Sequence, residues 1–453
     1  MSDIRDRVRS EPDIFLRLTQ NSMAVAKSIR ENFVENTLGL ASKLRENLEN
    51  NSLDGLTIKK LANNQNRRIT ASFIDGGVGE ADIFFRVPLI VRGGIFRIKE
   101  GERDLEKRET FEFFPVLIGD LEGGEKFGND YSSVIRIIIE LCSILRVLHD
   151  SKYQDVNLIM LHGPLLYRLS AYTEHWFFEN DIDIMTQTSG ELVQEFREDC
   201  KSCAVHKDSW CGIWKEQKKV RANCLISFLL NKAIKESPTK NIDLVGVVER
   251  ASATEISRDI FEKMLHLDAD LSIKFLGRSV ENYRSDAEKI VKSANFTDSL
   301  IFSLVLNAGE YLSFYDAKER YSGFSGDLGA KENKKDFGDK LPRISYTYLK
   351  SVDNTMSIRV EFPKESDKNS QIDALLKVYE YSRLLPNYAF PVGLDIADKF
   401  AKVPGWLLEA YRKYIMFNFG RLALDKELDQ QELQKILMFY YLHQRDFMLR
   451  PKS

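Results

Sequence analysis

The order of extended and helical patterns between residues 69 and 265 limits the fold more than any other feature of the sequence. Three extended segments come first, and a strongly apolar helix at residues 132–148 follows them. A strand, a polar helical stretch, a second strand and a second helix come next. An antiparallel meander followed by strand–helix alternation predicts a mixed sheet with helices on its faces.

The extended segments are short, and glycine, proline or polar residues bound them. Residues 69–74 form the first, and Asp75-Gly76-Gly77 is expected to stop it. A hairpin is expected next, with strands at residues 83–87 and 95–98 and a turn at Gly93-Gly94. The other strands are expected at residues 111–118, 155–161, 242–248, 344–349 and 357–362, with a helix at residues 253–265. The RNase H-like fold has this order, so we expect an RNase H-like α/β core.

The core is expected to occupy two stretches, residues 65–170 and residues 241–405, as its first and second halves. Helical patterns predict three further segments: an N-terminal one at 1–64, a cysteine-containing insertion at 171–240 and a C-terminal one at 406–453. A Gly- and Lys-rich stretch between Asp316 and Leu341 has no periodicity and is expected to be a loop.

Composition limits the class of protein further. The formal net charge of the 453-residue chain is −3, so any nucleic-acid contact must come from a local basic groove. The N-terminus has no apolar segment typical of a signal peptide, and no apolar run reaches membrane-spanning length. Five cysteines, three of them clustered, favour a reduced compartment over a disulfide framework. We therefore expect a cytoplasmic protein without a membrane segment.

Polar side chains stand where two of the expected strands end. Asp75 follows the strand expected at residues 69–74 and His162 the strand expected at residues 155–161, and each is followed by glycine. Sites in open α/β sheets form outside the carboxyl ends of strands, so these two side chains are expected to converge. Glu140 lies on the apolar helix between them and is expected to reach the same place. Phosphodiester cleavage needs divalent metal, and carboxylates from separate elements supply its hard oxygen ligands.

Each of these residues also has a structural interpretation. Aspartate before Gly-Gly is commonly a turn residue. Glu140 can pair with Arg136 one turn earlier on a solvated face. His162-Gly163-Pro164 can be a simple strand stop. The order and spacing of the three, rather than any one of them, favour a functional site.

Read together, the segments resemble the NurA nuclease family. Its first motif resembles SFIDGGVGEADIFFRVPLIVRGGIFRI, and its helix and following strand resemble IIELCSILRVL and DVNLIMLHGPLLYR. Later blocks resemble IDLVGVVERAS, DSLIFSLVLNAGEYLSF, SIRVEFP and NYAFPVGLDIADKFAKV. The resemblance covers residues 65–405, and its blocks stand in the family's order.

This resemblance implies a Mn²⁺- or Mg²⁺-dependent nuclease that acts on DNA ends. It also implies a homodimer docked on a hexameric HerA-like ATPase that translocates DNA. Asp75 and Glu140 match the family's first two metal ligands. His162 stands where the family has Asp, and Asp398 stands where it usually has His. The four residues are the expected catalytic and metal-binding set, with the last two residue types exchanged.

The two departures leave a second class of function open. A catalytically impaired NurA-like adaptor would seat DNA on the motor without cutting it. The His162 and Asp398 pair discriminates between the two functions. If both side chains face a common point with Asp75, the nuclease is favoured, and if they point away, the adaptor is favoured.

A second possible metal site lies in the helical insertion. Cys200, Cys203, His206 and Cys211 are spaced as C-x2-C-x2-H-x4-C, and Cys224 could replace the histidine. Zinc takes four such ligands in a tetrahedron, so a structural zinc is one interpretation. Ordinary thiols in a helical insertion are the other.

Basic and aromatic residues supply weaker indications. Arg92 and Arg97 neighbour the first motif and are the candidate DNA contacts. A solvated basic face is the commoner arrangement of such residues. The aromatic run around Tyr440 is more often core or subunit interface than a base-stacking platform. Gly76-Gly77-Val78-Gly79 lacks the ending of a nucleotide-binding loop, so no ATPase activity is expected in this chain.

Overall fold

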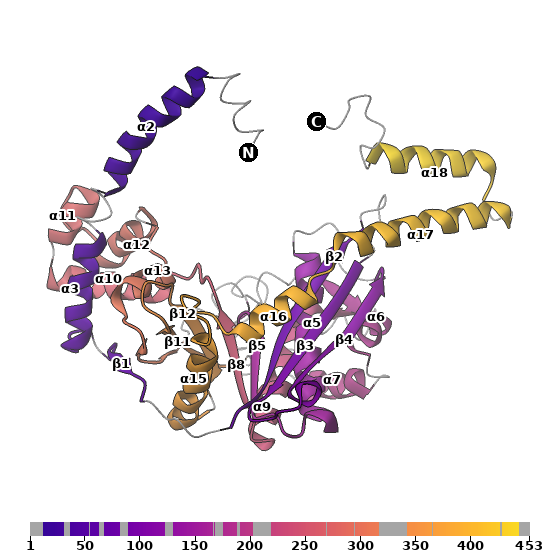
Figure 1. Ribbon diagram of the computed structural model, residues 1–453, viewed down its shortest axis with the longest axis horizontal. Coiled ribbons are helices and arrows are strands. Elements are labelled where there is room, and N and C mark those ends of the chain that lie inside the picture. The colour runs from indigo at the N-terminus through magenta and orange to yellow at the C-terminus, as the bar shows by residue number, and fades with distance from the viewer. Residues whose placement is uncertain are drawn as a thin grey trace. The chain divides into compact units, whose positions relative to one another are not determined.

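The structure is a computed structural model of the chain (Figure 1). It describes residues 12–30, 37–53, 55–62, 68–81, 89–122, 130–165, 167, 175–187, 191–202, 219–268, 270–293, 295–316, 342–364, 366–425 and 428–443.

The described chain divides into two compact units, each made of several stretches of sequence. Unit 1 comprises Met1–Leu61, Arg250–Ser313 and Tyr348–Ile358, and unit 2 comprises the remaining stretches. Residues 250–313 therefore group with the N-terminal helices, although the sequence patterns place them in the second half of the core. The five-segment division expected from the sequence stays a prediction.

Unit 1 is built mainly of helices. Leu40, Leu44 and Leu48 form the buried face of its second helix, which packs on α13. Asp298 begins α13, and its carboxylate accepts hydrogen bonds from the backbone of Ile256 and Ser257 in α10. The elements are α2 Pro12–Arg30, α3 Gly39–Glu49, β1 Ile58–Lys60, α10 Glu255–Leu267, α11 Asp270–Leu276, α12 Tyr283–Ser293, α13 Asp298–Val305 and β9 Glu310–Leu312.

Unit 2 contains the mixed sheet with flanking helices that the sequence predicts. Its strands are β2 Thr70–Glu80, β3 Leu89–Lys99, β4 Glu109–Gly119, β5 Leu158–His162, β8 Asp243–Val248, β10 Tyr315–Asp316, β11 Ile344–Lys350 and β12 Ile358–Pro363, with β11 and β12 partly in unit 1. A separate ribbon is formed by β6 Trp176–Phe178 and β7 Lys219–Arg221. The helices are α4 Leu105–Arg108, α5 Tyr131–His149, η2 Ser151–Tyr153, α6 Glu179–Thr186, α7 Glu191–Ser202, α9 Ala222–Thr239, α15 Lys368–Ser382, α16 Val392–Ala401, α17 Gly405–Leu424 and α18 Gln430–His443.

The strand order across unit 2 confirms the expected fold class. The neighbours run β12, β8, β5, β2, β3, β4. β2, β3 and β4 form the antiparallel meander, and β5 and β8 follow as parallel strands beside β2. The helix predicted at residues 132–148 and the strand predicted at 242–248 are both confirmed. The sequence therefore predicted the α/β class and a mixed sheet with flanking helices correctly.

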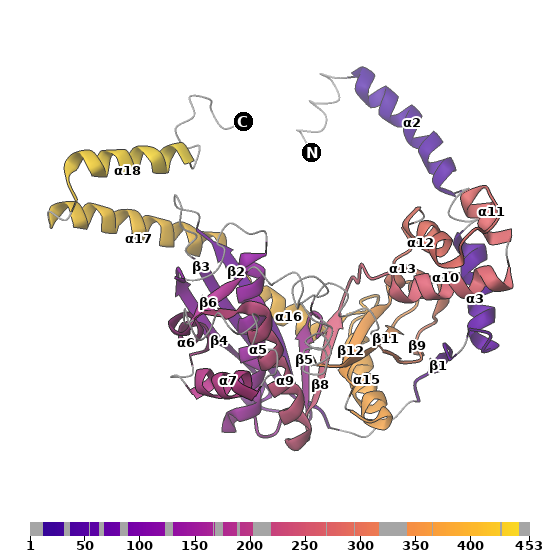
Figure 2. The ribbon, with the colours of Figure 1, turned by 180° about the vertical axis from the view of Figure 1, so that it is seen from behind.

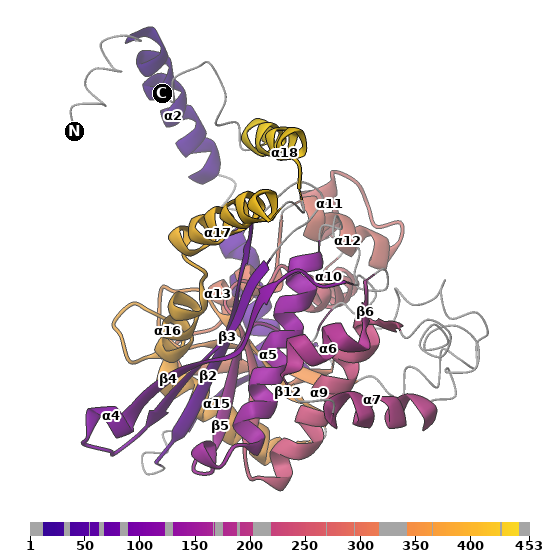
Figure 3. The same cartoon turned by 90° about the vertical axis from the view of Figure 1, so that its right-hand side faces the viewer.

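Helices cover both faces of the sheet. In Figure 1, α16 lies across β2 and β3, and Figure 2 shows α5 and α9 on the other face. The view in Figure 3 shows α5 and α16 on opposite sides of the strands. Contacts between Phe73 of β2 and Tyr381 of α15 place that helix on the α16 face as well. The sheet is therefore the middle of three layers.

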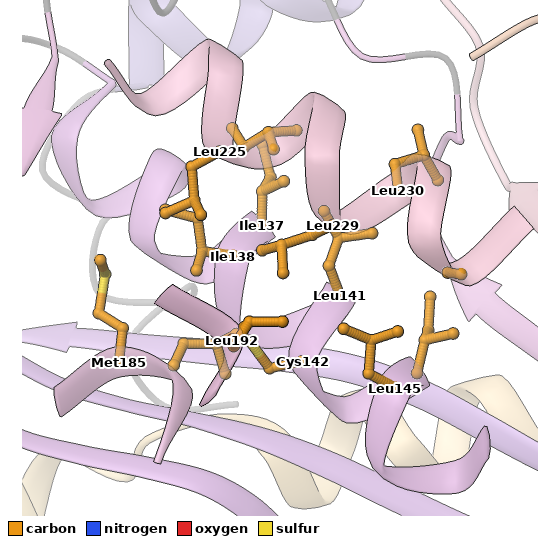
Figure 4. Packing of buried hydrophobic residues seen from close by; sticks show 14 of the residues in the cluster. Ile137, Ile138, Leu141, Cys142, Leu145, Met185, Leu192, Leu225, Leu229 and Leu230 are labelled. Atoms are coloured by element: carbon orange, nitrogen blue, oxygen red, sulfur yellow. The ribbon is translucent and has the colours of Figure 1, made fainter. Parts of the chain in front are cut away.

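A hydrophobic core cluster is centred on α5, which is apolar on almost every side. Ile137, Ile138 and Leu141 of α5 pack against Leu225 and Leu229 of α9 (Figure 4). A helix that is apolar all round must be buried between other elements. Met185 of α6 and Leu192 of α7 extend the same cluster, so the described part of the helical insertion shares this core.

Two sequence-based predictions about glycine are wrong. Asp75-Gly76-Gly77 does not stop the first strand, because β2 continues to Glu80 and pairs with β3 along its whole length. Gly93-Gly94 is not a turn, because both residues lie inside β3, opposite Gly76 and Asp75. The residues predicted as a strand at 83–87, and the loop predicted up to Leu341, lie outside the described residues.

These glycines are instead points of close helix approach. A Cβ atom on Gly77 would stand 1.7 Å from the carbonyl oxygen of Ala401 in α16. On the opposite face, a Cβ atom on Gly93 would stand 2.1 Å from the Ser143 hydroxyl of α5. Side chains therefore have to be absent here for both helices to reach the sheet.

Gly77→Ala is expected to lower the free energy of unfolding by about 1–3 kcal/mol, since the added methyl group displaces backbone of α16. Thermal unfolding followed by circular dichroism measures the loss. Gly405→Ala is the matched control, because a Cβ atom there meets nothing within 4 Å. Equal melting temperatures for Gly77→Ala and the wild type would contradict the close approach of α16.

Candidate metal centre

Asp75 and His162 meet where β5 ends beside β2. The two strands are parallel, and Ile74 pairs with Leu161, so the next residues of each strand lie side by side. His162 is the last residue of β5, whereas Asp75 is in the middle of β2. His162 Nδ1 lies 2.9 Å from Asp75 Oδ2. The expected convergence is therefore present, although Asp75 is not at a strand end.

Asp398 completes a cluster with these two residues. It comes from α16. This helix lies on the face of the sheet that carries the Phe73 side chain and toward which a Cβ atom on Gly77 would point. Side chains alternate between faces along a strand, so Asp75 points to this face too. One ligand atom from each of Asp75, His162 and Asp398 can be chosen so that all three lie within 4.8 Å of one another. His162 and Asp398 thus face a common point with Asp75.

Glu140 approaches from the opposite face and is not part of this three-residue cluster. It is buried on α5, and a Cβ atom on Gly76 would stand 2.7 Å from its Oε1 atom. Arg136 Nη1 lies 2.8 Å from Glu140 Oε1 and 4.0 Å from Asp75 Oδ1. The Arg136–Glu140 pair that the sequence allows does form, but the Glu140 side chain is only 3% exposed and does not lie on a solvated face.

The surroundings of Glu140 favour its neutral form. Burial raises the pKa of Glu140 from 4.5 to about 7, although Arg136 opposes the shift. The charge of Asp75 adds to the increase, because two nearby carboxylates repel each other when both are ionised. A nearby divalent cation would offset this repulsion, so the arrangement suits a site that binds positive charge.

The surroundings of His162 favour its charged form, in contrast to those of Glu140. Burial lowers the pKa of His162, but the hydrogen bond to Asp75 and the charges of Asp75, Asp398 and Glu140 raise it more. The net pKa is higher than the ordinary value of 6.5. The ring also packs against Phe390, with centroids 5.2 Å apart. Three acidic groups therefore act on one imidazole.

The donor atoms fit a divalent cation of the hard or intermediate class. Carboxylate oxygens are the ligands that Mg²⁺ and Mn²⁺ prefer, and imidazole is acceptable to Mn²⁺. Asp75, His162 and Asp398 are the residues that would hold such an ion. Asp75 would also fix the orientation of the imidazole ring through its hydrogen bond.

Lysine 402 lies beside the cluster and was not singled out from the sequence. Its Nζ atom lies 2.5 Å from Asp398 Oδ2, one helical turn away. The i,i+4 spacing of an acid and a lysine on α16 was the available signal. Such pairs usually lie on solvated faces, and only the position of α16 against β2 makes this one part of the site.

The two arginines proposed as DNA contacts both have partners within the protein. Arg92 donates to the backbone oxygens of Phe400, Ala401 and Lys402 at the end of α16. Arg97 is buried and pairs with Asp155. Arg92 therefore satisfies carbonyl groups that a helix C-terminus leaves without partners. DNA contact by either arginine stays a prediction.

The zinc prediction lies largely outside the described residues. Cys203, His206 and Cys211 are not among them, and the side chain of Cys200 is also not described. Cys224, the alternative ligand, is buried on α9. No helix in the described part of the chain is long and apolar enough to cross a membrane.

The fold and the cluster together define an α/β protein with a carboxylate–imidazole site at the centre of a mixed sheet. The sequence matches the family described as NurA domain over residues 70–403, which is most of the chain. The chain belongs to the NurA family. The search of curated proteins finds no match.

Solved structures similar to this chain include several from the same family. The NurA nuclease from Sulfolobus solfataricus has 13% identity and a TM-score of 0.49, covering 90% of this chain and 98% of that one. A NurA structure bound to dAMP and manganese has 12% identity and a TM-score of 0.36, covering 83% and 94%. Human ENDOV has 9% identity and a TM-score of 0.29, covering 81% and 96%.

Glu140→Gln is expected to stabilise the metal-free protein above pH 7. The folded protein holds the Glu140 proton to about pH 7, whereas the unfolded chain releases it near 4.5. Wild-type stability therefore falls as pH rises through this window, by on the order of 3 kcal/mol, and glutamine removes the effect. Melting temperatures in chelator from pH 5 to pH 8 measure it.

Glu409→Gln serves as the control for this series. Glu409 is an exposed helical glutamate paired with Lys413, and its pKa is lowered rather than raised. A difference between Glu140→Gln and wild type that stays constant from pH 5 to pH 8 would count against the raised pKa.

Proposed function

We propose that this chain is a divalent-metal-dependent nuclease acting on DNA ends. The observation that carries the proposal is the convergence of Asp75, His162 and Asp398 from three separate elements. Family membership supports it, and one NurA structure has been solved with dAMP and manganese bound. The convergence also favours a nuclease over the impaired adaptor, whose hallmark would be side chains that point away from one another.

The protein's own residues have distinct roles in this proposal. The Asp75 carboxylate would bind the metal while its Oδ2 atom also contacts His162 Nδ1. Its Oδ1 atom accepts a hydrogen bond from the Gly76 backbone N–H. Asp398 supplies the second carboxylate from α16. When bound, the divalent ion supplies Lewis-acid stabilisation of charge that develops on the phosphate. Glu140 is proposed as a further ligand. Its carboxylate packs against Gly76, close enough for the charge of Asp75 to act on it.

We also propose the assembly that the family resemblance implies. A homodimer would bind a hexameric HerA-like ATPase, and the motor would deliver DNA to this site in the cytoplasm. The exposed apolar side chains of α17 support a protein interface in this region: Trp406, Tyr414, Phe417 and Leu424. Large exposed apolar groups on one helix are typical of surfaces that another protein covers. A structural zinc at Cys200, Cys203, His206 and Cys211, and DNA contact by Arg92 and Arg97, complete the proposal.

Asp75→Ala is expected to abolish Mn²⁺-dependent DNA cleavage while the protein stays folded. Loss of a residue that only supports a metal ligand costs about 10–100-fold, so loss of a direct ligand should cost at least as much. A gel assay with end-labelled duplex DNA and Mn²⁺ measures the rate.

Asp395→Ala is the matched control for that assay. Asp395 lies on α16, as Asp398 does, but it pairs with Lys399 and is not in the three-residue cluster. Wild-type cleavage by a folded Asp75→Ala protein would sink the assignment of this site.

His162→Asp combined with Asp398→His is expected to retain more activity than either single change. The double variant restores the family arrangement, with one Asp and one His at the common point. Each single change alters the ligand inventory, and neighbouring ligands couple energetically. The same cleavage assay gives the three rates. If the double loss equals the sum of the single losses in free energy, the two positions are independent and the exchange is not compensatory.

A further inference from the structure

Lysine 402 combines a fixed backbone with an exposed side chain. It is the residue directly after α16, and its carbonyl oxygen accepts a hydrogen bond from Arg92 Nη2 at 2.6 Å. The preceding carbonyl, on Ala401, lies in the space left by Gly77. The Lys402 side chain is 68% exposed. The base of the side chain is therefore held against the sheet, while its end is accessible to solvent.

The ammonium group of Lys402 is directed to the candidate metal centre. Among the described residues it pairs with Asp398, at 2.5 Å from Oδ2. Asp398 is one of the three residues whose ligand atoms converge. The lysine thus donates a hydrogen bond to a carboxylate oxygen of Asp398 that a divalent cation would use as a ligand.

We propose that Lys402 is a phosphate-binding residue, which exchanges Asp398 for a phosphate group of the nucleic-acid substrate when a divalent cation binds. This inference rests on the proposed function of the site. A cation held by Asp398 competes with the ammonium group for the carboxylate and repels it at short range. The fixed backbone keeps the ammonium group close to the cluster after release. A phosphate group bound to the same cation would then be the anion closest to the ammonium group. Lysine is a common phosphate ligand.

The same helix carries a control with the same local chemistry. Lys399 pairs with Asp395 at 2.8 Å, with the same i,i+4 spacing and the same exposed fraction of 68%. Asp395 is not part of the converging cluster. A general effect of removing a lysine from α16 would appear in both variants, and a phosphate contact only in Lys402 variants.

The test is calorimetric titration of dAMP into wild type, Lys402→Ala, Lys402→Gln and Lys399→Ala in saturating Mn²⁺. The probe dAMP has a terminal phosphate and no phosphodiester to cleave, and deoxyadenosine is the probe without phosphate. Both Lys402 variants are expected to bind dAMP about ten- to a hundredfold more weakly, as for loss of a charged hydrogen bond. Lys399→Ala should match the wild type, and deoxyadenosine should not distinguish the four proteins.

Titration of Mn²⁺ alone separates phosphate binding from support of the metal site. Lys402→Ala is expected to bind Mn²⁺ at least as tightly as wild type, because a competing ammonium group is gone. Unchanged dAMP affinity in the Lys402 variants overturns the proposal. Loss of Mn²⁺ affinity in Lys402→Ala, or no dAMP binding by the wild type at millimolar concentration, also overturns it. DNA cleavage by the same wild-type preparation reports separately on the proposed nuclease function.

Discussion

The structure at the centre of unit 2 depends on glycines in the paired strands β2 and β3, which lie between two helices. Gly77 admits the end of α16 from one face, and Gly76 admits the Glu140 carboxylate of α5 from the other. Asp75 lies on the strand immediately before these glycines. A sheet is normally separated from its helices by a full layer of side chains, so acids on either helix would stay away from the strand. Here the missing Cβ atoms let both helices approach closely. The first requirement of the site is therefore steric, and the choice of acidic residues comes second.

Once the acids are close together, charge decides what the site can bind. Asp75, Asp398 and buried Glu140 share the region with Arg136, His162 and Lys402, which each pair with one of the acids. Burial and repulsion raise the pKa of Glu140 to about 7, so this arrangement costs stability in the metal-free protein near neutral pH. Functional sites commonly retain such costs. The same acids become favourable together when a divalent cation lies between them, which is consistent with a metal-binding role.

The sequence indicated a mixed α/β sheet and a set of candidate site residues, but not their geometry. Hydrophobic patterns are local, and they predicted α5 and β8 correctly. Glycine was misread, since turns and close contacts with distant helices use the same residue, and the contact of Gly77 with Ala401 joins residues more than 300 positions apart. The Asp398–Lys402 pair was not predicted either, because its i,i+4 spacing is also that of ordinary solvated pairs. The sequence supplied Asp75, His162 and Asp398 as candidates that the structure brings together, whereas the face of the sheet from which each side chain arrives required the packed structure.

Crystals grown with Mn²⁺ and measured at the manganese absorption edge test the metal centre most directly, since the anomalous signal locates the ion without reference to activity. We predict a manganese peak within about 2.5 Å of oxygen or nitrogen atoms of Asp75, His162 and Asp398, with Lys402 released from Asp398. A peak held by Asp75 and Glu140 while Asp398 stays paired with Lys402, or no peak in this region at saturating Mn²⁺, would contradict it.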